Sequence, residues 1–270
     1  MRSIPLSATR CAIAASLFLG LAAQAHTPWL QPSSTVLSKA EWITVDASVS
    51  TEPFVVDHQP MPVDNIQVTA PDGSSLAPEN ALRGKLRSVF DLNLSKPGTY
   101  RVAVVNTGAF ASWKDKATGQ TKRARTSAES LERDIPADAQ DVNVTQSQGR
   151  VETWVTVGKP TVPAPTGQGL ELVPVTHPND LAKGEAATFA FNIDGKPAAN
   201  LPVTVVAGGA RYRDTPVEIK ATTDANGRFS VTWPAAGLYA IEAGMRDDKT
   251  TIARAKERRV SYTGTVEVLP

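Results

Sequence analysis

Short stretches in which apolar and polar residues alternate run through most of the chain. In residues 41–49, Ile43, Val45 and Ala47 alternate with polar or exposed-type side chains. A period of two with one apolar face is typical of a strand that covers a core on one side. The same kind of pattern predicts further strands at 66–70, 87–94, 100–105 and 150–157. This spacing indicates an immunoglobulin-like sandwich in residues 26–158.

The second half repeats this organisation after a segment that contains Pro160, Pro163 and Pro165. Proline favours extended backbone and cannot donate to a strand ladder, so residues 159–169 are predicted to form a semi-rigid linker. Strands are expected beyond it at 170–175, 186–193, 201–206, 217–222, 228–233, 238–243 and 259–269. The fold class predicted is therefore all-β, with a second immunoglobulin-like sandwich in residues 170–270.

An internal echo links the two halves. Tyr100 follows Phe90 by ten residues, Tyr239 follows Phe229 by ten, and a glycine stands two residues before each tyrosine. A tyrosine at such a corner packs its ring inward while its hydroxyl bonds nearby backbone. We expect both tyrosines to hold the fold rather than to bind a ligand.

Residues 112–139 interrupt the regular succession of strand patterns. They carry a run of cations and a short helix-compatible stretch at 127–133, where Ser127 and Ser130 make a poor capping pattern. Charge runs of this kind are typical of a solvated insertion between two strands. The alternative is a lid or a loop that docks a partner.

The N-terminus has the layout of a secretory signal peptide over residues 1–25. Arg2 and Arg10 precede or flank an apolar run at 11–23, and Ala25 ends a small-x-small cleavage site. That run is too short to cross a bilayer. We therefore predict export to the periplasm and a mature chain that begins at His26.

Processing changes the composition. Cys11 is the one cysteine and leaves with the signal, so no disulfide or thiolate ligand is expected in the mature chain. Removal of two arginines turns 28 basic and 27 acidic residues into 26 and 27. A near-neutral chain argues against a nucleic-acid partner, and no later apolar run is long enough for a membrane-embedded protein.

The three histidines are the best candidates for chemistry. A mature N-terminal His26 offers its α-amine and its imidazole to one metal ion, and both can lose a proton near neutral pH at modest cost. His58 is the natural second donor, and Asp57 can ligate or orient its imidazole. Met61 would add a thioether for Cu(I), and His177 would join only if the two halves meet there. Nitrogen donors favour nickel, cobalt, copper or zinc.

Common catalytic patterns are missing from the sequence. It contains no Gly-x-Ser-x-Gly elbow, no His-Glu-x-x-His pair and no glycine-rich phosphate loop. We therefore expect a non-enzymatic protein. A copper monooxygenase, which also uses a mature N-terminal histidine, is a remote alternative because the five tryptophans suggest no exposed aromatic surface.

Residues 26–32 (HTPWLQP) are similar to the opening of a formally uncharacterised family of bacterial periplasmic proteins assigned to cobalt or nickel uptake. Residues 170–185 and the turns at 194–197 and 223–229 also resemble that family. The resemblance implies a periplasmic protein that handles a transition metal beside an uptake system in the inner or outer membrane. It does not identify the metal or assign His58.

The leading hypothesis is a periplasmic protein that binds nickel, cobalt or copper through His26, His58 and Asp57, and that buffers the metal or assists its uptake without catalysis. The partner would be a membrane metal transporter. The alternative is a metal-independent interaction module of the cell envelope that docks a membrane partner through residues 112–139.

Overall fold

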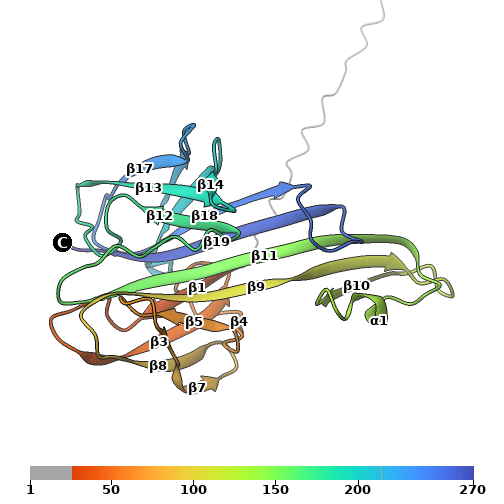
Figure 1. Ribbon diagram of the computed structural model, residues 1–270, viewed down its shortest axis with the longest axis horizontal. Helices are drawn as coiled ribbons and strands as arrows, with labels where there is room; N and C mark the ends of the chain where they lie inside the picture. Colours follow the sequence, from red (N-terminus) through yellow and green to blue (C-terminus); the bar gives the residue numbers. More distant parts are fainter. Residues whose placement is uncertain (1–25, 214) are drawn as a thin grey trace, which may run out of the picture.

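The computed structural model describes residues 26–213 and 215–270, and the predicted signal peptide at 1–25 lies outside this part. The described chain is almost entirely strand, arranged in three layers of sheet (Figure 1). One outer sheet comes from the first half of the chain and the other from the second half. The middle sheet draws strands from both halves. The two predicted immunoglobulin-like sandwiches are confirmed, and they share this central sheet.

The first outer sheet contains β1 (Thr27–Pro32), β3 (Glu41–Ser50), β4 (Gln59–Pro60), β7 (Glu79–Arg83) and β8 (Ser88–Leu94). The second outer sheet contains β12 (Leu170–Pro174), β13 (Ala186–Ile193), β14 (Lys196–Pro197) and β17 (Arg228–Thr232). The central sheet contains β2 (Val36–Leu37), β5 (Ile66–Thr69), β6 (Ser75–Leu76), β9 (Gly98–Lys114), β10 (Thr121–Thr126), β11 (Gln140–Val157), β15 (Pro202–Ala207), β16 (Glu218–Thr222), β18 (Gly237–Asp247) and β19 (Glu257–Val268). Two short helices complete the described elements, α1 (Leu131–Asp134) and a 3-10 turn (Ala210–Tyr212).

The two sandwiches are fused through a parallel strand pair. β11 of the first half pairs with β19 of the second half, from Thr145 with Glu257 to Thr153 with Thr265. Every other long ladder in the central sheet is antiparallel. The backbone ladder therefore continues from one sandwich into the next, and the linker is not their only connection.

The predicted linker lies against the sheets. Thr161 and Thr99 exchange hydrogen bonds between the backbone N–H of each and the side-chain hydroxyl of the other, at 2.9 and 3.0 Å. Farther along, the backbone N–H groups of Thr166 and Gly167 donate to the buried carboxylate of Glu171. These bonds fix a segment that its prolines predict to be only an extended spacer.

Alternating side chains of the central sheet fill two separate cores. Val102 and Val104 of β9 and Val155 of β11 face the first outer sheet, where they pack with apolar residues of β3 and β8. Ile241 of β18 and Tyr262 of β19 face the second outer sheet. Burial of these side chains stabilises the fold by roughly 1.5–3 kcal/mol each.

A buried polar group lies at the seam between the sandwiches. The Tyr262 hydroxyl donates to a Glu152 carboxylate oxygen at 2.8 Å, and the guanidinium groups of Arg101 and Arg150 approach the other oxygen at 3.7 and 3.5 Å. Burial raises the pKa of Glu152, and the two arginines oppose that shift. Ion pairing therefore offsets part of the desolvation cost where β9, β11 and β19 meet.

Tyr100 and Tyr239, the tyrosines of the repeated sequence pattern, have the structural role predicted for them. The backbone N–H of Lys96 donates to the Tyr100 hydroxyl at 2.7 Å, and the Tyr239 hydroxyl donates to the Ala235 carbonyl at 2.8 Å. Both rings are buried. The preceding glycine has a positive φ in each copy, 122° at Gly98 and 134° at Gly237, a conformation that other residues rarely adopt.

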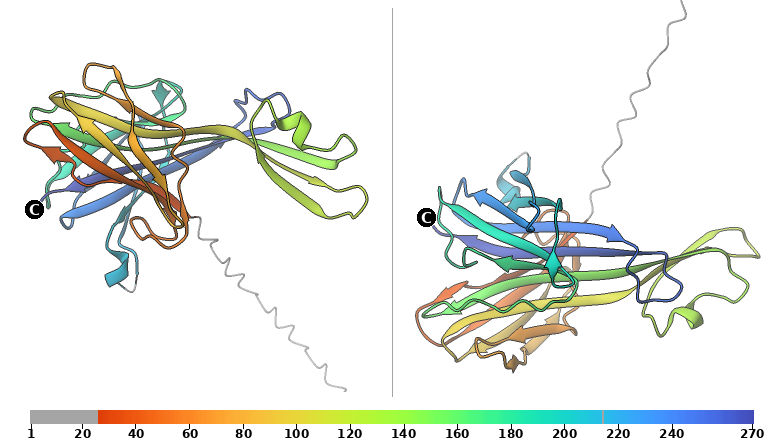
Figure 2. Two further views of the ribbon diagram at one scale, coloured as in Figure 1. Left: turned by 90° about the horizontal axis from the view of Figure 1, so that it is seen from below. Right: turned by 45° about the horizontal axis from the view of Figure 1, so that its top comes forward.

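Strands β9 and β11 continue well past the sandwiches and form an arm with β10 and α1 (Figure 2). The predictions of strands at 100–105 and 150–157 were therefore too short. The arm has a small core that includes Ala111, Trp113, Leu131 and Val144, and Ile252 of the connection between β18 and β19 completes it. As the poor capping pattern indicates, α1 is only four residues long. Within the described residues, no helix has the length and apolar character needed to span a membrane.

Candidate metal centre

The structure brings His26 and His58 into direct contact. Their ring centroids are 3.7 Å apart and the ring planes differ by 7°. His26 precedes β1 and His58 precedes β4, and both of these strands pair with the end of β3. Thr27 lies opposite Ser50 and Gln59 lies opposite Val49. The two histidines therefore meet where β3 ends, although they are 32 residues apart in the chain.

The loop between β3 and β4 is held by contacts that begin in β1. The indole Nε1 of Trp29 donates to the Ser50 hydroxyl at 2.7 Å, and the Phe54 ring lies 5.6 Å from the Trp29 ring. Phe54 has a positive φ of 66°, which turns the loop back. The backbone N–H of Thr51 donates to the Asp57 carboxylate at 3.2 Å. These contacts of the loop therefore hold His58 beside the start of β1.

The paired rings supply two nitrogen ligands, but not in a binding orientation. The lone pairs of an imidazole lie in the plane of the ring, so two parallel rings do not both point at one ion. Both histidines are exposed, so binding of one ion by both requires a change of side-chain rotamer at the surface. Among the described residues, no three His, Cys, Asp or Glu side chains come together as a metal-binding group. Asp57 precedes His58 in the chain, and its carboxylate accepts the hydrogen bond from the backbone N–H of Thr51.

Met61 and His177 lie elsewhere. Met61 is buried in the core of the first sandwich, where its thioether is inaccessible to an ion at His58. His177 is half-buried, and its Nε2 lies 3.0 Å from the Thr99 hydroxyl and 3.1 Å from the Thr161 carbonyl. Burial lowers the pKa of His177. Thr99 is at the opposite end of the sandwich from His26, since β1 runs from His26 toward β2, and β2 pairs with β11 beside Thr99.

One carboxylate near the histidines was not predicted from the sequence. Glu242 of β18 is half-buried, and its carboxylate lies close enough to the side chain of Thr27, the neighbour of His26, for Thr27 to lower its pKa. Burial raises the pKa of Glu242, Thr27 lowers it, and Glu218 raises it further. In the sequence Glu242 is an ordinary polar position of an alternating strand. Its place beside β1 follows from the packing of the two sandwiches.

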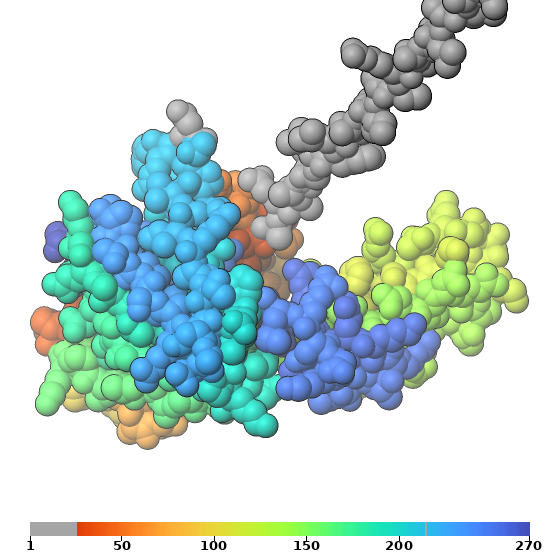
Figure 3. Space-filling model, turned by 90° about the horizontal axis from the view of Figure 1, so that it is seen from above, coloured from red at the N-terminus to blue at the C-terminus, as the bar shows by residue number. Residues whose placement is uncertain are grey.

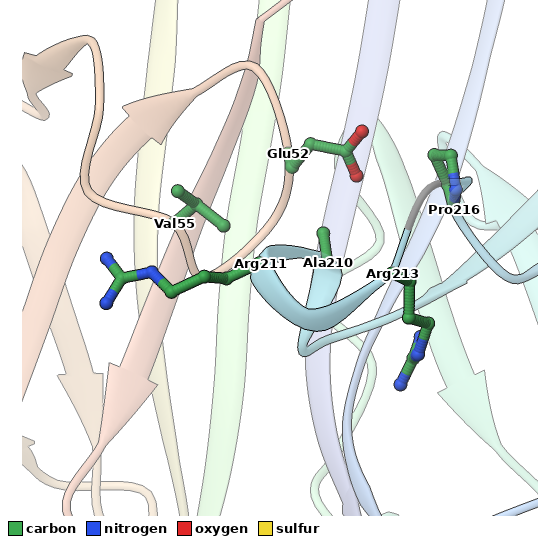
Figure 4. A pocket seen from close by; sticks show the side chains of 6 residues that line it. All are labelled: Glu52, Val55, Ala210, Arg211, Arg213 and Pro216. Carbon is green, nitrogen blue, oxygen red and sulfur yellow. The ribbon is translucent and has the colours of Figure 1, made fainter.

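A shallow hollow of about 240 Å³ lies between the β3–β4 loop and the 3-10 turn (Figure 4). It is lined by Glu52, Val55, Arg211 and Arg213, among others. The two arginine side chains extend away from each other, and the Glu52 carboxylate is turned from both. These groups do not converge on one point, so the hollow adds no ligand to the histidine pair.

The model of one protein family, described as a domain of unknown function (DUF4198), matches residues 23–247. No curated protein matches the chain at a significant level.

Several solved structures match the chain with low TM-scores. They include the D0–D1 domain of intimin (14% identity, 89% of this chain, 97% of that one, TM-score 0.24). An adhesin of Yersinia pseudotuberculosis, InvE, matches at 13% identity over 89% of this chain and 60% of its own, with a TM-score of 0.22. Three fibronectin domains of chicken CNTN1 match at 9% identity over 90% and 98%, with a TM-score of 0.22.

Proposed function

We propose that this chain, which belongs to the DUF4198 family, binds a divalent transition metal through the α-amine and imidazole of a processed His26 and the imidazole of His58. The Asp57 carboxylate or a water completes the coordination. The observation that supports this proposal is the contact between the two exposed rings at 3.7 Å. The metal is cargo, and the protein buffers it or passes it on without catalysis.

The chemistry of the donors favours nickel, cobalt or copper. Amine and imidazole nitrogens suit these ions, and copper leads in intrinsic affinity. The mature N-terminus is essential because a peptide bond before His26 would remove the amine lone pair. A site at the surface leaves coordination positions open, which suits an ion that has to be released.

The setting of this function is the periplasm, beside a metal transporter of the inner or outer membrane. The signal-peptide pattern of residues 1–25 and the resemblance of residues 26–32 to proteins of cobalt or nickel uptake support this part of the proposal. The likeness to adhesins adds nothing to it, because the TM-scores are low.

The test is a calorimetric titration of Cu(II), Ni(II) and Co(II) into exported protein whose N-terminus is verified as His26. The matched control carries six additional glycine and serine residues before His26, which keep every side chain and place the α-amine too far from the imidazole to chelate with it. We expect one-to-one binding in the processed protein and a loss of at least about 100-fold in affinity in the extended one, since the chelate loses its α-amine ligand. Equal affinities in the two proteins, or no binding in either, would contradict the proposal.

A further inference from the structure

The arm lies outside the metal site and both sandwich cores. It comprises the ends of β9 and β11 together with β10 and α1, residues 107–147. In the space-filling view it projects beyond the two sandwiches, and its base packs against the connection between β18 and β19 (Figure 3). Ile252 of that connection belongs to the core of the arm. The length of the arm is explained neither by the packing of this core nor by the proposed metal site.

The two faces of the arm differ in character. Ala111 and Trp113 of β9 point toward α1 and pack in the arm core. Their neighbours on the strand therefore point the opposite way. Phe110 lies opposite Arg125 of β10, and Ser112 lies opposite Arg123. We call the surface formed by Phe110, Ser112, Lys114, Arg123 and Arg125 the outer face.

The acidic residues of the arm are mostly engaged within the protein. Asp141 pairs with Lys114 at 2.7 Å, and Glu132 pairs with Arg254 at 3.0 Å. Asp134 accepts from the Thr126 hydroxyl, and Asp115 accepts from Thr118. Three of the six acidic residues of the arm, Glu132, Asp134 and Asp141, are therefore held in ion pairs.

Most of the cations of the arm, in contrast, form no ion pair among the described residues. Lys116, Lys122, Arg123 and Arg125 take part in none of the ion pairs within 4.0 Å found among the described residues. All four side chains are exposed or nearly so. Two of them lie on the outer face and the other two lie near the tip of the same hairpin. The arm carries six basic and six acidic residues, so its accessible positive charge is local to the outer face, where Arg123 and Arg125 have no ion-pair partner among the described residues.

The outer face also exposes an aromatic ring. Phe110 is 40% exposed, whereas Ala109 and Ala111 on either side of it are buried. An apolar ring on a strand is normally placed against a core, and here it lies between the arginines and the polar side chains of β11. Aromatic rings beside arginine and lysine are typical of protein surfaces that contact the headgroup region of a bilayer.

We propose that the outer face of the arm binds the surface of an anionic phospholipid membrane. The cations complement the negative headgroups, and each contributes to binding near such a surface. Phe110 enters the boundary between headgroups and acyl chains. The projection of the arm lets a flat surface reach this face without contact with the sandwiches. This binding does not require the metal.

The test is co-sedimentation of the full mature protein with vesicles, in buffer that contains a chelator. One set of vesicles is phosphatidylcholine and the other is an equal mixture with phosphatidylglycerol. The variant R123Q/R125Q removes two cations from the outer face. The matched control K39Q/K159Q removes two exposed cations far from the arm, and circular dichroism verifies that both variants fold.

We expect binding to the mixed vesicles alone, which weakens as salt is added. The arm variant should bind about 25-fold less tightly, roughly fivefold for each cation, and the control should stay within about twofold of the wild type. F110S should also weaken binding. Equal losses in the two charge variants, or no dependence on phosphatidylglycerol, would overturn the proposal. Binding of polyglutamate but not of vesicles would overturn it in favour of an acidic protein partner.

Discussion

The His26–His58 pair and His177 show how differently one side chain can be used in the same molecule. His177 is half-buried, and its two ring nitrogens contact Thr99, Thr161 and Asn179. His26 and His58 are exposed and contact each other. A histidine whose nitrogens already have protein partners holds structure, whereas one whose nitrogens face solvent is available to an ion.

This contrast predicts that only one of two alanine substitutions lowers metal affinity. His58→Ala removes a ligand and should weaken binding of the preferred ion by about 100-fold, because removal of supporting groups alone costs 10- to 100-fold. His177→Ala should leave affinity within about twofold. Calorimetric titration of both variants measures this. A larger loss in His177→Ala would reverse the assignment of the two sites.

The same substitutions should have the opposite order in their effect on stability. His177→Ala removes the acceptor of the Asn179 backbone N–H and one of the partners of the Thr99 hydroxyl, and it should lower the free energy of unfolding by about 1–3 kcal/mol. His58→Ala, at an exposed position, should change it by less than about 0.5 kcal/mol. Urea denaturation monitored by tryptophan fluorescence gives both values. A destabilisation by His58→Ala that matches His177→Ala would mean that the paired rings serve the fold.

The smallest expected effect is the pH dependence of the free energy of unfolding. Because burial lowers the pKa of His177 in the folded protein, the unfolded chain binds a proton first as the pH falls. Stability should therefore decrease as the pH falls below about 6.5, and the decrease should level off below the folded pKa. Urea denaturation at about pH 7.5 and about pH 5.5 compares the wild type with His177→Gln. A wild type that loses no more stability than this variant would contradict the assignment.

The sequence predicts most of the strands because apolar and polar residues alternate wherever a strand buries one face and exposes the other. Residues 41–49 and 186–193 correspond closely to β3 and β13. The pattern fails in the arm, where the buried positions of β9 include small alanines and the exposed positions carry charges. It also misses β1, whose two prolines and buried Trp29 do not alternate in a simple way.

The site could be predicted only in part. The chemistry of an N-terminal histidine marks His26 in the sequence, and the sequence favours His58 over His177 as the second donor because His177 lies beyond the linker. The contact between His26 and His58 depends on the pairing of β1 and β4 with the same end of β3, a long-range feature that local patterns do not contain. Glu242 is missed for the same reason, because it reaches Thr27 from the other sandwich.

The most direct test is the effect of paramagnetic Cu(II) on the amide signals of ¹⁵N-labelled, correctly processed protein. A bound Cu(II) ion broadens signals within a limited radius, so the spectrum locates the ion without any substitution. We predict that sub-stoichiometric Cu(II) removes the signals of Thr27 and Gln59 and leaves those of Thr161 and Asn179 sharp. Selective broadening around His177, or uniform weak broadening over the whole chain, would contradict a metal site at His26 and His58.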